Sequence, residues 1–374
     1  MTLKTVMEAY DLLDDANVGG RDVVEFVRSE GLEGGTTEAV EGPKGTTDFV
    51  TFIIPGTNGK SVGGTAPTLG VIGRLGGLGA RPSRIGFTPD GDGALAAVSV
   101  AAKLARMQRK GDRLEGDVIV TTQICPNAPT RPHEPVPFMD SPVTSEICNR
   151  HEVHPDMDAI LCIDTTKGNR ILNKRGFAIT PTVRDGWILH VSEDLLEIME
   201  TTTGEPAAVL PLTMQDITPY GNDVYHLNSI LQPSVVTDRP CVGVAITTVT
   251  KVAGCATGAT HPVDVEETVR FVIETAKAFA AGKCEFCDEA EYALLQKKYG
   301  SMRHLRTMGR AEKEAGSGLP TQSKSNSTKG PTHDYLHTLD GRHRHAADDR
   351  RPSEALGNAP RTLCLRPSDG HALA

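Results

Sequence analysis

Carboxylates and an imidazole stand beside apolar runs of this sequence, at positions where a fold could gather them. Asp90 and Asp92 lie in a glycine-rich turn ahead of a helical pattern, and Asp164 ends an apolar run. His261 directly precedes another helical pattern. Carboxylate oxygen and imidazole nitrogen are both ligands that zinc accepts, so Asp90, Asp164 and His261 are candidate metal ligands.

Each of these residues also has an ordinary structural explanation. Acidic side chains at a helix N-terminus are stabilised by its partial positive charge, which alone would account for Asp90 and Asp92. A single His is more often structural than a ligand, and the turn before Asp223 is equally well explained as a plain turn. Asp164 is the most informative charge, because a carboxylate that ends an apolar strand is costly to bury without a partner.

The elements that would position these residues alternate along the chain. Strands are predicted at residues 48–54, 83–87, 117–123, 158–163, 207–212 and 241–249, and helices at 93–108, 192–202 and 264–280. This alternation predicts an α/β fold with a mainly parallel or mixed sheet and helices on both faces. Ligands of such sheets bind beyond the carboxyl ends of the strands, which is where the candidate residues fall.

The order of the motifs resembles the dinuclear zinc aminopeptidases of the glutamyl and deblocking aminopeptidase family over about residues 48–282. The likeness rests on four segments: Asp90-Gly91-Asp92-Gly93-Ala94, residues 158–166, Tyr220-Gly221-Asn222-Asp223 and residues 261–266. It implies a phosphorylase/hydrolase-like, zinc-aminopeptidase-like core. The body of the chain resembles more closely an uncharacterised bacterial family called domain of unknown function 1177, which implies no activity.

The sequence departs from the aminopeptidase pattern at two places. No His stands near residues 67–70, where that family has its first metal ligand, and Ile124-Cys125 replaces the pair of Glu that supplies a base and a ligand. Cys125 becomes the fourth candidate, because thiolate also suits zinc. The resemblance, so amended, predicts one divalent metal ion, zinc, held by Asp90, Cys125, Asp164 and His261.

Hydrolysis at such a site would need a base from elsewhere in the chain. The proline-rich loop after Cys125 contains Glu134, which we predict as the general base, although a solvent-exposed loop charge is the plainer explanation. Asp92 and Asp223 are predicted to orient the metal-ligating side chains without contacting the metal ion themselves. The predicted activity is that of a metallopeptidase-like hydrolase of peptide or amide bonds, with a small peptide or amino-acid derivative as partner.

Two other classes of function stay open. A protein that kept this fold and lost catalysis would bind a small molecule or peptide without turnover, and the missing His and Glu pair favour that alternative. The segment Gly56–Ser61 resembles the phosphate loop of ATP-dependent amide ligases, but poor helix formers follow it. Cys284 and Cys287 form a single pair of thiols, which is weak evidence for a metal or redox site.

Composition limits the partners and the location. The chain has 374 residues and a formal net charge of −9, which gives no overall attraction to nucleic acid or to an anionic membrane. Its apolar runs are too short to span a bilayer, and its eight Cys are scattered as reduced thiols would be. We therefore predict a cytoplasmic protein that binds neither nucleic acid nor membrane. Whether it forms a homo-oligomer is left open.

Three regions are predicted along the chain. Residues 1–41 are expected to form an N-terminal helical segment and residues 42–309 the α/β hydrolase-like domain. Residues 310–374 are rich in Ser, Pro, Arg, Gly and His and poor in large apolar residues, so they are predicted to be a disordered, low-complexity tail. Their abrupt change of composition is also what an out-of-frame translation would produce.

Overall fold

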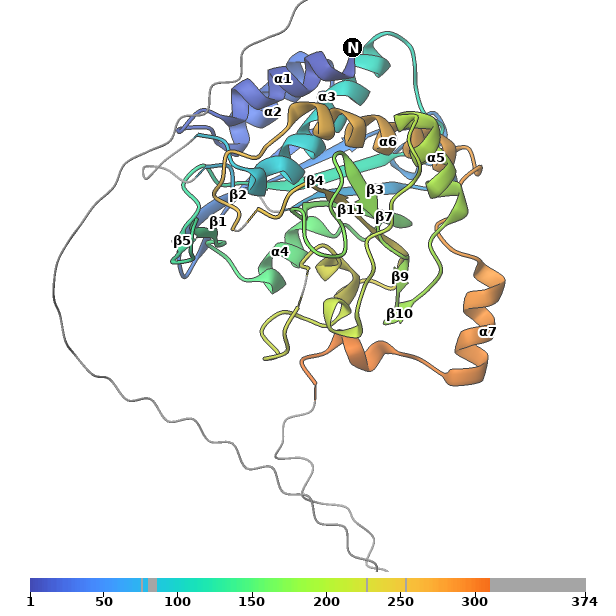
Figure 1. Cartoon of the computed structure of the whole chain (residues 1–374). Coiled ribbons are helices and arrows are strands. Elements are labelled where there is room, and N and C mark those ends of the chain that lie inside the picture. Colours follow the sequence, from blue (N-terminus) through green and yellow to red (C-terminus); the bar gives the residue numbers. More distant parts are fainter. Residues whose placement is uncertain (75–76, 80–85, 227, 253, 310–374) are drawn as a thin grey trace, which may run out of the picture. The chain divides into compact units, whose positions relative to one another are not determined.

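The computed structural model describes residues 1–309, apart from residues 75–76, 80–85, 227 and 253 (Figure 1). Its main sheet has the order β1-β2-β4-β3-β7-β11-β9-β10, and β8 pairs with β11. The strands are β1 (Gly35–Gly42), β2 (Gly45–Ile54), β3 (Leu69–Gly73), β4 (Val118–Ile124), β7 (Ala159–Thr165), β8 (Phe177–Ile179), β9 (Val183–Arg184), β10 (Trp187–Ile188) and β11 (Cys241–Ile246). A separate small hairpin pairs β5 (Thr130–Arg131) with β6 (Phe138–Met139).

The centre of the sheet is parallel and its flanks are antiparallel. Strands β4, β3, β7 and β11 run in the same direction, whereas β2 on one side and β8 on the other run against them. The edge strand β1 is antiparallel to β2 and therefore runs in the direction of the central strands. In this register Leu69 lies between Val118 and Ala159, so β3, β4 and β7 begin together, and β3 ends at Gly73, opposite Thr122 and Ile163. Their carboxyl ends therefore meet at one edge, where chemistry-bearing residues follow the strands.

Helices cover both faces of the sheet. Helices α1 (Thr2–Leu13), α2 (Gly20–Ser29), α3 (Asp92–Arg109), α5 (Glu193–Thr203) and α6 (Pro262–Ala280) contribute to one apolar core. On the other face lies α4 (Ser145–Glu152), on the opposite side of the sheet from α1, α2, α3 and α6 (Figure 1). Alternate residues of β4 explain the two layers, because Val118 and Val120 join the first core while Ile119 joins a second one. Helix α7 (Glu289–Tyr299) follows α6.

This arrangement confirms the predicted α/β fold with a mixed sheet and helices on both faces. The three predicted helices and four of the predicted strands are present with slightly shifted ends. The strand predicted at residues 207–212 is wrong: this segment makes only an isolated bridge between Ile179 and Val209. The strand predicted at 83–87 falls mostly outside the described residues. Strands β1 and β3 were not predicted.

The N-terminal residues are built into the same sheet and core. Helices α1 and α2 bury apolar residues against α3, and Arg106 of α3 binds Glu8 and Glu30 at 2.9 and 2.5 Å. Residues 35–42 form β1, which pairs with β2 along its whole length. The predicted boundary at residue 41 thus falls inside a strand. Residues 310–374 lie outside the described part of the chain, so the tail stays a prediction.

No helix in the described part of the chain is both long enough and apolar enough to cross a bilayer.

Candidate functional site

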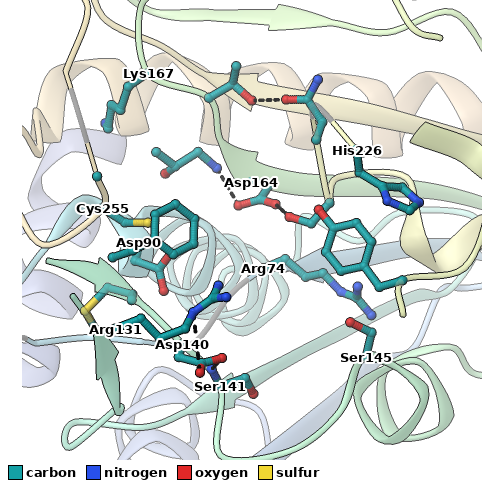
Figure 2. Close-up of a pocket in the computed structure, with 18 of the residues that line it drawn as sticks. Arg74, Asp90, Arg131, Asp140, Ser141, Ser145, Asp164, Lys167, His226 and Cys255 are labelled. Carbon is teal, nitrogen blue, oxygen red and sulfur yellow. Dashed lines mark hydrogen bonds and ion pairs between the residues drawn. The ribbon is translucent and has the colours of Figure 1, made fainter. Parts of the chain in front are cut away.

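A pocket of about 890 Å³ opens at the carboxyl edge of the parallel strands (Figure 2). Arg74 follows β3 directly, Asp164 lies near the end of β7, and Lys167 follows two residues after that strand. Asp90, just before α3, and Cys255, in the loop before α6, complete this side of the lining. The pocket therefore lies where the predicted sheet topology placed a ligand site.

Asp90 and Asp164 face this pocket from different segments of the chain. They are only 7% and 5% exposed. The two segments are tied together because the Thr165 hydroxyl donates to the carbonyl of Pro89 at 2.5 Å. Asp164 accepts hydrogen bonds from its neighbour's amide, Thr165 N, at 2.7 Å and from Ser229 Oγ at 2.8 Å. The pair is thus held by the fold on the wall of one cavity.

The two carboxyl groups differ in their affinity for a proton. Burial raises the pKa of Asp90 to about 8, and the negative charge of Asp164 adds to this, while a hydrogen bond with Cys255 opposes it. Burial also raises the pKa of Asp164, to about 6, against hydrogen bonds from Ser229 and Thr165 that favour its charged form. Both carboxyl groups therefore hold a proton more firmly than an exposed Asp, and the pKa of Asp90 is raised further than that of Asp164.

Asp92 is neutralised by a lysine. It is fully buried at the start of α3, and Lys167 Nζ lies 3.2 Å from its Oδ2. Burial raises the pKa of Asp92 to about 6, and the charge of Lys167 is the largest opposing influence. Lys167 also lines the pocket, so its ammonium group supplies positive charge beside the two acids.

Arg74 and Lys167 were missed by the sequence analysis. The signal for Arg74 was the same as for Asp164, a charged residue directly after a buried strand. That strand, β3, is only five residues long and contains two glycines, which weakens its pattern. Lys167 follows the predicted strand and the Asp164 motif, and its position after the strand end was the available signal.

The structure brings together only two of the four predicted metal ligands. Cys125 is buried, donates to the carbonyl of Thr46 over 3.8 Å and does not line the pocket. Burial raises the pKa of its thiol to about 11. His261 caps the start of α6, close enough to Asp92 to influence its pKa, but it is also absent from the pocket lining.

The predicted base and the predicted orienting residue lie elsewhere. Glu134 is an exposed residue of the proline-rich loop, and Asp223 is an exposed turn residue with φ of 64°. Neither lines the pocket. Asp92 does lie behind the site, where it binds Lys167.

The donor set does not fit the predicted zinc ion. Among the residues that the structure describes, no group of three or more His, Cys, Asp or Glu side chains could hold a metal ion. The thiol of Cys125 is engaged with a carbonyl oxygen, and Asp92 is engaged with an ammonium group. The ammonium group of Lys167 thus lies beside the carboxylates, where the sequence had predicted a zinc ion.

The segment that resembles a phosphate loop already holds a carboxylate. The amides of Gly56 and Ser61 donate to Asp117 at 2.8 and 2.7 Å, and Ser61 Oγ donates to it at 2.8 Å. Lys60 Nζ lies 2.6 Å from Asp158 Oδ2. The donors that would bind a nucleotide phosphate are therefore occupied by the protein's own acids, and the structure gives no support to an ATP-dependent ligase.

The pair of thiols at Cys284 and Cys287 is not activated. Burial raises the pKa of Cys284 to about 12, and it raises the pKa of Cys287 as well, against the nearby Arg184. Both thiols therefore stay protonated near neutral pH, which argues against a reactive cysteine at this position.

The sheet, its helical layers and the pocket at its carboxyl edge define an α/β protein with a mixed sheet. The chain belongs to the family described as "Protein of unknown function (DUF1177)", whose model matches residues 38–309. No curated protein matches it.

Two solved aminopeptidase structures are similar to the chain at low identity. One is the LapA aminopeptidase of Legionella pneumophila, with 13% identity, a TM-score of 0.43 and coverage of 74% of this chain and 70% of that one. The other is a mutant of tomato leucine aminopeptidase, with 12% identity, a TM-score of 0.43 and coverage of 72% of this chain and 61% of that one. Likenesses at this level carry no argument about activity.

Proposed function

We propose that this protein hydrolyses an amide bond in a small peptide or amino-acid derivative, with Asp90 and Asp164 as its acid and base. The observation that carries the proposal is that two nearly buried carboxyl groups from separate segments face one pocket. Their different pKa values support the same assignment, because a hydrolytic site needs a donor and an acceptor at one pH.

The roles follow from the protonation states. Asp164, ionised, takes a proton from a water molecule whose oxygen forms a bond to the amide carbonyl carbon. Asp90, protonated, gives its proton to the amide nitrogen as the carbon–nitrogen bond breaks. Transfer of the proton from Asp164 to Asp90 through solvent restores the starting state. Lys167 supplies positive charge near the carbonyl oxygen as its negative charge develops. No step passes through a metal ion, because the donor set does not fit one.

The test is turnover by the purified full chain. A panel of dipeptides and N-acyl amino acids is screened by release of primary amine, and the best substrate is used with variants. We expect D90N and D164N each to lower kcat/KM by about 100-fold or more. D223N is the matched control, since Asp223 is an exposed Asp outside the pocket, and it should match the wild type. Unchanged turnover in both pocket variants would overturn the proposal.

The same assay separates this proposal from the zinc prediction. C125A and H261A should retain activity, and a chelator should leave the rate unchanged, because neither residue lines the pocket. If a chelator abolishes turnover, zinc restores it, and either variant is inactive, the metal site predicted from the sequence holds instead.

Binding without turnover is the second candidate, and the charge of the lining favours it. Among the described residues, the lining holds six basic side chains, Lys44, Arg74, Arg131, Lys167, Arg170 and Lys251, and three acidic ones, Asp90, Asp140 and Asp164. Two of the basic side chains are paired with acids outside the lining, Arg74 with Glu152 and Lys167 with Asp92. This positive excess, in a chain of net charge −9, suits an anionic small molecule or peptide. Calorimetric binding of a peptide that is recovered intact would favour this candidate.

A further inference from the structure

Arg74 is the largest fully buried side chain in the described part of the chain, and it also lines the pocket. It is 1% exposed, and its backbone amide donates to the carbonyl of Ile163 at 2.7 Å, which fixes it beside β7. Removing an arginine from water is costly even when it is paired. Such a residue at the wall of a cavity therefore calls for an explanation beyond stability.

The guanidinium group is held from one side. Its Nε donates to Glu152 Oε2 at 2.7 Å, and Nη2 donates to Asn149 and lies 2.7 Å from the same Glu152 oxygen. Both partners belong to α4 and are buried. The remaining nitrogen, Nη1, has no hydrogen-bond partner among the described residues. The group is thus fixed in orientation, with donor capacity left over.

Hydroxyl groups line the pocket near this arginine. Figure 2 shows Arg74 between Asp164 and Ser145, and Ser145, Tyr220 and Ser229 all belong to the lining. Because Ser229 donates to Asp164, the candidate donors are Nη1 of Arg74 and the hydroxyls of Ser145 and Tyr220. A fixed, charged N–H donor with neighbouring hydroxyl groups suits a carboxylate, because a charge-assisted hydrogen bond from Nη1 can hold one oxygen and a hydroxyl group the other.

We propose that Arg74 anchors a carboxylate group of the ligand, so that the pocket selects peptides or amino-acid derivatives that carry a free carboxylate. The inference rests on the proposed function for the choice of pocket, and it adds the ligand class. Arg74 is a specificity-determining residue here, whereas Asp90 and Asp164 act on the amide bond.

The test is calorimetric binding to the full chain with matched probes. N-acetylalanine carries the carboxylate and N-acetylalaninamide lacks it, so we expect the acid to bind at least about 10-fold more tightly. R74K, which keeps the charge but loses the planar donors, and R74M should both lose this preference. R150M is the matched control, because Arg150 lies on the same helix as Glu152 and outside the pocket.

A second variant guards against misfolding. R74M leaves Glu152 buried without its partner, so R74M/E152Q, which removes both charges, is measured alongside, and circular dichroism checks each fold. Equal binding of acid and amide by the wild type would overturn the proposal, as would a retained preference in folded R74M/E152Q. Tighter binding of inorganic phosphate than of the acid would overturn the assignment to a carboxylate.

The outcome can be told apart from that of the hydrolase proposal. D90N should bind N-acetylalanine like the wild type, because the anchor is intact, although its kcat/KM for a substrate should fall by about 100-fold or more. Acid-selective binding with no turnover in the wild type would leave the anchor standing and remove the hydrolase. Turnover without selective binding of the acid would support the hydrolase and overturn the proposed carboxylate anchor.

Discussion

At the scale of single residues, burial raises the pKa of Asp90, so the ionised form of this side chain destabilises the fold at high pH. The groups that influence it are Asp164 of β7, Asp92 of α3, Cys255 and Lys167. In the folded state its pKa is about 8, above the value of 3.8 for an unburied Asp. Between these pH values the folded protein holds a proton that the unfolded chain releases, so stability falls as pH rises through this window.

D90N should remove this loss. We expect the variant to be more stable than the wild type at pH 8 to 9 by at least about 1 kcal/mol and nearly equal to it at pH 4. Asp92 and Asp164 also lose stability with rising pH, but they remain in both proteins, so the difference isolates Asp90. Thermal unfolding across this pH range measures it, with D223N as control. A D90N protein that is no more stable at pH 9 would show that Asp90 ionises normally.

The sequence predicted two of the acidic residues that line the pocket, Asp90 and Asp164, but not Asp140 or the basic residues. Asp164 was predicted as a site residue because a charged side chain at the end of an apolar strand is costly to bury. Asp90 was predicted because it precedes a helix at the same edge of the sheet. Cys125 satisfied the same positional rule, yet its thiol donates to the carbonyl of Thr46 and does not line the cavity. The direction in which a side chain points after the end of a strand depends on the local turns of the backbone. The order of residues in the sequence does not specify these turns.

At the scale of elements, the loop of residues 55–61 is shaped by Asp117 at the start of β4. Three hydrogen bonds from Gly56 and Ser61 reach this one carboxylate. A Cβ at Gly59 would lie 1.8 Å from Asp117 Oδ1, so only glycine allows this approach. Similar residues cradle a nucleotide in other proteins, but here an internal acid takes the place of the phosphate.

D117N should therefore destabilise the fold. We expect a loss of about 1–3 kcal/mol in the free energy of unfolding, because several donors lose a charged acceptor, and a loss of about 1 kcal/mol for S61A. Urea denaturation followed by circular dichroism measures both. Addition of ATP should leave the melting temperature of the wild type unchanged. A rise in melting temperature with ATP that D117N or S61A alters would support the ligase alternative.

Long periodic elements were predictable, and short or irregular ones were not. Helix α6 buries Val265, Val269, Val272 and Ile273, which are spaced three and four apart in the sequence, and helix α3 is a long apolar run that is buried on almost all sides. The segment at 207–212 has the apolar composition of a strand, and Ala208 and Leu210 contribute to the core, but its backbone bonds to the sheet are those with Ile179. Tertiary contacts, not local pattern, decide such segments.

At the scale of the whole described chain, the first forty residues complete the fold rather than precede it. Helices α1 and α2 bury Val6, Ala9, Leu13, Val23, Val24 and Val27 against the core that α3 and α6 share. Arg106 joins α3 to Glu8 and Glu30 through the same interface. Strand β1 covers the edge of β2, which would otherwise expose its hydrogen-bonding groups.

A truncated chain of residues 42–309 should consequently fail to fold cooperatively. Removal of residues 1–41 exposes the apolar side chains of α3 that α1 and α2 cover. Each large side chain that is no longer buried costs roughly 1.5–3 kcal/mol, and the sum over several of them exceeds the net stability of many domains. A chain of residues 1–309 is the control and should melt like the full protein, because the composition of residues 310–374 gives them little apolar surface to bury. Thermal unfolding followed by circular dichroism distinguishes the two truncations. A cooperative transition for residues 42–309 within a few degrees of the control would show that the N-terminal helices and β1 are dispensable, and it would support the boundary predicted at residue 41.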